Sequence, residues 1–90
     1  MKFEIETKKE SIGYRIEIQV NAEGGEEIAS VSTIYENFEI GNDYLSPSEV
    51  QYQRIFTQVG GYTPGVERTV AVSATNTAGK QQTASRRWKD

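Results

Sequence analysis

The chain has 90 residues, of which 36% are hydrophobic and 26% charged, so we expect one globular domain that is neither disordered nor inserted in a membrane. Its net charge of −3 disfavours nucleic acid as a partner, because nucleic-acid-binding surfaces are usually basic. The sequence contains neither Cys nor His, which removes disulfides, thiolate nucleophiles, the commonest metal ligand and the usual general base near neutral pH.

The N-terminal part of the chain predicts two strands, each with one buried and one solvated face. In the first, Phe3 and Ile5 alternate with charged residues. In the second, every other residue is apolar: Ile12, Tyr14, Ile16, Ile18 and Val20. Such alternation is typical of a half-buried strand. Residues 21–25, Asn-Ala-Glu-Gly-Gly, then predict a turn, because Asn and Gly tolerate positive φ.

The middle of the chain predicts a third strand followed by a loop. Residues 28–35 form this strand, and its expected inward face consists of Val31, Thr33 and Tyr35. Two more apolar residues extend the strand or form a short neighbour: Phe38 and Ile40. Residues 41–48, Gly-Asn-Asp-Tyr-Leu-Ser-Pro-Ser, are interpreted as a loop, since Pro47 excludes a central strand. A helical turn starting at residue 46 is the alternative.

The C-terminal half predicts three more strands. Residues 50–59 place Tyr52 and Phe56 on one face, and a Gly- and Pro-rich break follows. The segment 69–85 then alternates, turns at residues 76–79 and alternates again. Its expected inward residues before the turn are Val70, Val72 and Ala74. After the turn, one face holds Gln82, Ala84, Arg86 and Trp88, and the other Thr83, Ser85 and Arg87. Six to seven short strands predict an all-β fold, either an antiparallel two-sheet sandwich or a small barrel.

Residues 62–85 resemble the last third of fibronectin type III domains. A Pro-Gly turn leads into an alternating strand that ends Ala-Thr-Asn-Thr-Ala-Gly, and a final strand containing Ser follows. Bacterial Ig-like domains with a Thr-Ala-Gly turn are also similar, and residues 28–35 look like their central strand. Two positions depart from the family: Val20 or Ile18 stands where a buried Trp is expected, and Arg68 replaces the Tyr of a tyrosine corner.

The resemblance implies a fold of about seven strands, an antiparallel Ig-like or fibronectin III-like sandwich. It also implies that residues 1–90 are one domain of a larger bacterial surface or secreted protein. We therefore expect the parent's neighbouring domains as partners, a monomer, no cofactor, and an extracellular location conferred by the parent. The N-terminal Met-Lys-Phe-Glu-Ile-Glu lacks the apolar core of a signal peptide, so we expect none in this chain. The Arg-Gly-Asp adhesion tripeptide of some relatives does not occur in the 76–79 turn.

Catalysis and metal binding are not expected. Most of the 13 carboxylates are predicted on outward faces or turns, whereas a glycosidase needs two of them across a cleft. A sandwich of this size has little material for such a cleft, and the usual triads lack their His or Cys. The best approximations to a calcium site are residues 23–27 and the pair Asn42 and Asp43, which turn chemistry explains.

Exposed aromatic side chains are the best candidates for ligand or partner contacts. Tyr35 and Tyr52 are expected in the core, whereas Tyr44 and Tyr62 are predicted in loops. Trp88 is the third candidate, although it is also expected to pack at a sheet edge beside cations that discourage strand pairing. We therefore expect a non-catalytic structural or interaction module. The alternative is a module that binds polysaccharide or a surface protein through these aromatic rings.

Overall fold

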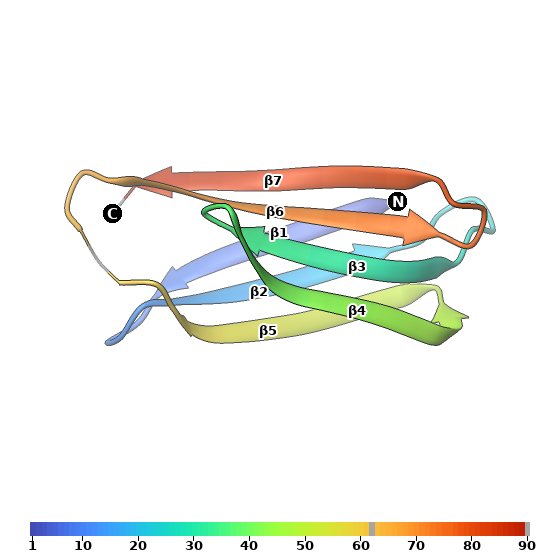
Figure 1. Ribbon diagram of the computed structural model, residues 1–90, viewed down its shortest axis with the longest axis horizontal. Coiled ribbons are helices and arrows are strands. Elements are labelled where there is room, and N and C mark those ends of the chain that lie inside the picture. Colours follow the sequence, from blue (N-terminus) through green and yellow to red (C-terminus); the bar gives the residue numbers. More distant parts are fainter. Residues whose placement is uncertain (62, 90) are drawn as a thin grey trace.

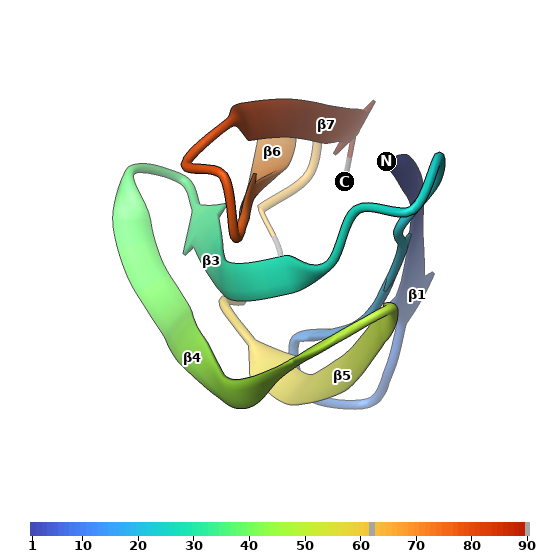
Figure 2. The same cartoon turned by 90° about the vertical axis from the view of Figure 1, so that its right-hand side faces the viewer.

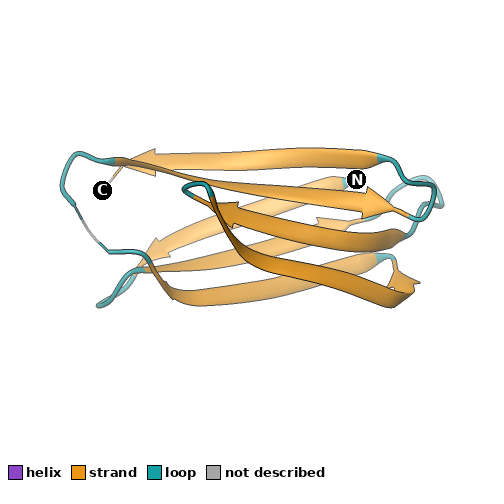
Figure 3. Ribbon diagram, viewed as in Figure 1, coloured by secondary structure: helices purple, strands orange, loops and turns teal. Residues whose placement is uncertain are grey.

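The structure, a computed structural model, describes residues 1–61 and 63–89. Among these residues there are strands and turns but no helix (Figures 1 and 3). The strands are β1 (Lys2–Lys9), β2 (Tyr14–Asn21), β3 (Ile28–Tyr35), β4 (Phe38–Glu49), β5 (Gln51–Val59), β6 (Glu67–Asn76) and β7 (Gln81–Lys89).

The strands form two antiparallel sheets that pack against each other. One sheet has the order β1-β2-β5 and the other the order β4-β3-β6-β7. Seen end-on, the sheets are two layers, and β4 curves from the side of β3 toward β5 (Figure 2). The prediction of an all-β, seven-stranded antiparallel sandwich is confirmed.

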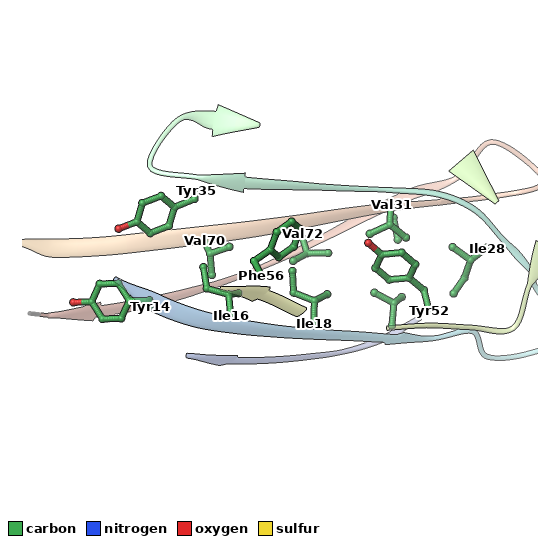
Figure 4. Packing of buried hydrophobic residues seen from close by; sticks show 12 residues of the cluster. Tyr14, Ile16, Ile18, Ile28, Val31, Tyr35, Tyr52, Phe56, Val70 and Val72 are labelled. Carbon is green, nitrogen blue, oxygen red and sulfur yellow. The ribbon is translucent and has the colours of Figure 1, made fainter. Parts of the chain in front are cut away.

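The core lies between the sheets and follows the predicted alternation (Figure 4). The largest side chains that are less than 2% exposed are Ile16, Ile18, Ile28, Val20, Val31, Val70, Val72 and Thr33. Tyr35, Tyr52 and Phe56 are also buried, as predicted. Burying one Val or Ile side chain contributes about 1.5–3 kcal/mol, so this continuous layer supplies most of the favourable free energy of folding.

The predicted start of the second strand is wrong. Ile12 lies before β2 and is 64% exposed, although it continues the apolar alternation. Gly13 interrupts the pattern, because it adopts φ 68° and lies against the backbone of residues 58–60. A Cβ at this position would lie 2.8 Å from that backbone, so only Gly allows the approach.

The predicted loop at residues 41–48 is also wrong, because the whole segment belongs to β4. β4 is the outermost strand of its sheet, and an edge strand tolerates a Pro that a central strand excludes. Phe38 and Ile40 accordingly lie in a neighbouring strand, one of the two predicted alternatives. Asp43 lies within this strand and not in a turn.

The molecule is a rod with dimensions of 43 × 18 × 17 Å. β1 begins at one end of the rod and β7 finishes at the opposite end (Figure 1). This arrangement results from an odd number of antiparallel strands that all run along the long axis. The connections consequently gather at the two ends and leave both broad faces to strand residues.

Candidate functional site

Tyr44 is the most exposed of the large hydrophobic side chains among the described residues, at 79%. It lies in β4 rather than in the predicted loop, and pairs with Ser30 of β3. Neighbouring residues of β4 alternate between exposed and half-buried, and Tyr44 is on the exposed side. Its ring is therefore presented by a sheet, which fixes its position more firmly than a loop would.

Trp88 is directed differently, toward the core. Its ring centroid lies 5.2 Å from that of Tyr14, with the planes at 75°, and 6.2 Å from that of Tyr35. The indole Nε1 is buried and has no hydrogen-bond partner among the described residues. The three rings close one end of the core, so Trp88 fills the structural role that we considered beside the binding role.

The structure does not bring Tyr44 and Trp88 together. The row of paired residues that contains Tyr44 ends at Gln81 of β7, and Trp88 lies seven residues further along that strand. Seven residues of a strand span about 23 Å. The third candidate, Tyr62, lies outside the described residues. No shared site of the three aromatic residues is therefore defined.

A polar cluster that the sequence did not reveal connects the two sheets. The Tyr52 hydroxyl donates to Asp43 Oδ2 at 2.5 Å, and Arg54 Nη1 donates to the same oxygen at 2.8 Å. The Arg54 guanidinium also lies 4.4 Å from the centre of the Phe56 ring. Gly41 leaves space for the Phe56 ring and the guanidinium above it, since a Cβ at residue 41 would lie 2.7 Å from that ring. The sequence does contain a signal, the alternation of Gly41, Asp43 and Leu45. This alternation indicates one face of a strand only if the strand that contains Pro47 lies at the edge of a sheet.

These contacts shift the ionisation of all three groups in the cluster. The hydrogen bond from Tyr52, and then that from Arg54, hold the pKa of Asp43 below its usual value. Burial, reinforced by the Asp43 carboxylate, raises the pKa of Tyr52 well above that of free tyrosine. The carboxylate also raises the pKa of Arg54. Each shift favours the charge states that hold the cluster together, which indicates a structural link and no group prepared for proton transfer.

Arg68, the residue expected to be a Tyr from the resemblance, makes a side-chain contact to the backbone upstream of it. Its Nη2 donates to the carbonyl oxygen of Gly61 at 3.2 Å. A tyrosine corner likewise joins a side chain to the backbone a few residues upstream. Nη1 of Arg68 lies 3.9 Å from Glu36 Oε1, in the turn between β3 and β4. The arginine thus ties two connections at the same end of the rod to β6.

The turn at residues 76–79 is a hairpin connection organised by one side chain. Asn76 Oδ1 accepts hydrogen bonds from the backbone N–H groups of Ala78 and Lys80, at 3.0 and 2.9 Å. Asn76 Nδ2 donates to Glu26 Oε1 at 3.1 Å, which links this turn to the connection between β2 and β3. This bond, followed by the Met1 ammonium and the Glu23 backbone, lowers the pKa of Glu26 to about 2. Both donor and acceptor atoms of Asn76 are used within the protein.

The surface hollows are shallow. Two of about 100 Å³ lie on the outer face of the three-stranded sheet and share Glu6 and Glu17 among their lining residues. A third of about 240 Å³ lies beside the turn between β3 and β4. All are smaller than the roughly 300–1,000 Å³ of pockets that enclose drug-sized ligands. Within residues 1–61 and 63–89, no three His, Cys, Asp or Glu side chains are grouped as metal ligands.

In comparison with known proteins, no family model, curated protein or solved structure matches the chain. In the described part of the chain, no helix has the length and apolar character needed to cross a bilayer. The features of the chain itself are a seven-stranded β-sandwich and two strongly exposed aromatic rings in β4, those of Phe38 at the start of the strand and Tyr44 within it.

Proposed function

We propose that this chain is a non-catalytic fibronectin type III-like or Ig-like module that spaces and orients neighbouring domains of a bacterial surface or secreted protein. The strand order supports the fold family, because β7-β6-β3-β4 matches the order G-F-C-C′ of variable-type Ig sheets. The contact from Arg68 to Gly61 supports it further, since it takes the place of the tyrosine corner.

The single observation that carries the spacing role is the shape of the rod. Its long dimension is 43 Å, and the first and last strands reach opposite ends (Figure 1). A domain inserted in a chain in this way separates the domain before it from the domain after it. The continuous core, together with the side-chain links between the edge strands, keeps that separation fixed.

The proposal is tested by measuring the rigidity of the rod. The chain has no Cys, so Ile12→Cys and Thr77→Cys place one spin label in the connection at each end of the rod. Double electron–electron resonance spectroscopy measures the distance between the two labels. It should give one narrow distance distribution that stays unchanged across solution conditions short of unfolding. A broad or multiple distribution in a folded sample would show that the domain cannot set a spacing.

A second candidate function is favoured by one observation, the exposure of Tyr44. A Tyr ring combines an apolar face with a hydroxyl, and such rings are enriched where proteins contact ligands and partners. In this alternative the chain is a monomeric binding module for a polysaccharide or a surface protein. Titration of the wild type and of Tyr44→Ala with cell-wall polysaccharides separates the binding module from a pure spacer, because only a binding module binds them and loses affinity on substitution.

A further inference from the structure

The outer face of the four-stranded sheet carries an uncharged polar region. One row of paired residues crosses all four strands: Tyr44, Ser30, Thr75 and Gln81. The next row consists of Asn42, Ser32, Ser73 and Thr83. In it, the hydroxyls of Ser73 and Thr83 are 2.8 Å apart and share a hydrogen bond. Within the described residues these two rows carry hydroxyl and amide groups, one aromatic ring and no charge.

The same face is hollowed at its other end. The hollow of about 240 Å³ is lined by Ile34, Thr69 and Ala71 and by the turn residues Glu36 and Asn37. Both turn residues have positive φ, 54° and 88°, which is the geometry of a two-residue hairpin. Ile34 is 37% exposed there and offers an apolar contact. The hollow is therefore formed by a tight turn and small neighbouring side chains.

Tyr44 and the hollow are displaced from each other along the strand direction. Tyr44 pairs with Ser30, and Ile34 is four residues further along the same strand. Four residues of a strand span about 13 Å. A ligand that contacts both features must consequently be extended, and it would lie across the uncharged row between them.

We propose that this face binds an uncharged, extended oligosaccharide whose rings contact Tyr44 at one end and the hollow beside Ile34 at the other. This inference rests on the second candidate function and specifies its ligand class and its location. Sugar hydroxyls match the hydroxyl and amide groups of the two rows, and the apolar side of a sugar ring matches the face of Tyr44. An anionic polymer would find no cation in these rows.

A protein partner fits this face less well. Protein interfaces depend on aromatic and Arg anchors at their centre and are depleted in Ser. Here the centre consists of Ser32, Ser73 and Thr83, with the single ring of Tyr44 at the margin. The outer face of the three-stranded sheet is unsuitable for a neutral ligand, because its paired rows include Glu6, Glu17 and Lys8.

The affinity should be modest, with a Kd in about the millimolar range, because a flat face encloses little of the ligand. Titrations of isotope-labelled protein, monitored by NMR, detect such binding. The probes are neutral linear gluco- and xylo-hexasaccharides, their monosaccharides, and a hexagalacturonate of matched length. The neutral hexasaccharides should shift the amide signals of Ser30, Ser32 and Ser73, whereas the monosaccharides and the anionic oligomer should shift them little.

Two substitutions locate the site. Tyr44→Ala should weaken hexasaccharide binding about tenfold, or ~1.4 kcal/mol. Ala71→Gln, which fills the hollow without adding charge, should weaken it similarly. Ile55→Ala, a half-exposed residue on the outer face of the other sheet, is the matched control and should bind normally. The NMR spectrum of each variant reports directly whether the variant is folded.

The proposal is overturned if no neutral hexasaccharide shifts these signals, if the shifts map elsewhere, or if Tyr44→Ala binds as well as the wild type. Equal binding of the anionic oligomer, or a response of this face to peptides alone, also contradicts it. None of these results changes the distance between labels at residues 12 and 77, so the spacing function is judged separately.

Discussion

The Arg54 guanidinium lies 2.8 Å from the Asp43 carboxylate and joins the edge strands of the two sheets. β5 is an outer strand of one sheet and β4 of the other, and backbone pairing does not connect them within the described chain. The Tyr52 hydroxyl donates to the same carboxylate oxygen. This side of the sandwich is therefore closed by side chains.

Replacing the shared acceptor should loosen this side. Asp43→Ala leaves the Tyr52 hydroxyl and the Arg54 guanidinium without their acceptor, and we expect a loss of about 2 kcal/mol in the free energy of unfolding. Urea denaturation measures this loss. Asn42→Ala, at the neighbouring position, is the control and should change stability by less than about 0.5 kcal/mol. Equal effects of the two substitutions would show that the cluster is not a link.

Acid should weaken the protein through its carboxylates with lowered pKa values. The pKa of Glu26 is about 2 in the folded state, compared with about 4.3 in an unfolded chain. Its stabilisation is therefore complete above the unfolded value and is lost as the pH falls from about 4 to about 2. Asp43, whose pKa is also lowered, acts in the same direction. Glu26→Gln should flatten the acid limb of a stability–pH curve, and an unchanged limb would refute the assignment.

The inward face of β6 is tested by burying a charge. Val72 is fully buried between the sheets, so Val72→Asp should cost more than about 3 kcal/mol and prevent folding in mild denaturant. Ser73→Asp places the same group on the outer face of the same strand and should leave the protein folded. Thermal unfolding monitored by circular dichroism compares the two. Near-wild-type stability of Val72→Asp would show that the face assignment is wrong.

The contact from Arg68 to Gly61 suggests a substitution that tests the family resemblance. Arg68→Ala removes the hydrogen bond to Gly61 and should cost about 1–2 kcal/mol. Arg68→Tyr should recover much of that loss, because a Tyr hydroxyl makes the corresponding contact in a tyrosine corner. Chemical denaturation of the three proteins gives the comparison. If Tyr is no better than Ala, the corner is not of the family type.

Asn76 should matter more than the rest of its turn. Asn76→Ala removes two hydrogen bonds to the backbone and the one to Glu26, so we expect a loss of about 1–3 kcal/mol. Thr77→Ala, at an exposed position of the same turn, should be nearly neutral. Hydrogen exchange of the Lys80 amide provides a local measurement and should quicken only in the Asn76 variant. A large effect at Thr77 would argue against the role assigned to Asn76.

The sequence predicts the core well because alternation leaves one dominant solution for β2, β3 and β6. A register shift of one residue in β2 or β6 would expose Ile16 or Val72 together with the other inward residues of that strand, so the hydrophobic pattern determines which face is buried. The same reasoning does not predict β4. Its inward positions hold Gly41 and Asp43, which are not typical of a core, and Pro47 indicates a strand breaker unless the strand is known to be at an edge. Edge position is a property of the assembled sheet.

The candidate site was harder to predict for a related reason. An aromatic residue near the end of a sandwich can point inward or outward, and only the partner strands decide. Trp88 meets Tyr14 and Tyr35 and packs inward, whereas Tyr44 has Ser30 beside it and stays on the surface. Arg54 gave no signal because its partner, Asp43, is eleven residues away in a segment whose composition is typical of a loop.

The spacing role is tested most directly by pulling one domain from its two ends, within a chain of well-characterised marker domains. β1 and β7 leave the rod at opposite ends, so the force acts along the strands, and the eight paired positions of β1 and β2 are loaded together in shear. We predict a single cooperative rupture, with extension of this domain only after that event. Gradual extension without a distinct rupture would contradict the account, because a domain that yields in this way cannot hold its neighbours at a fixed separation.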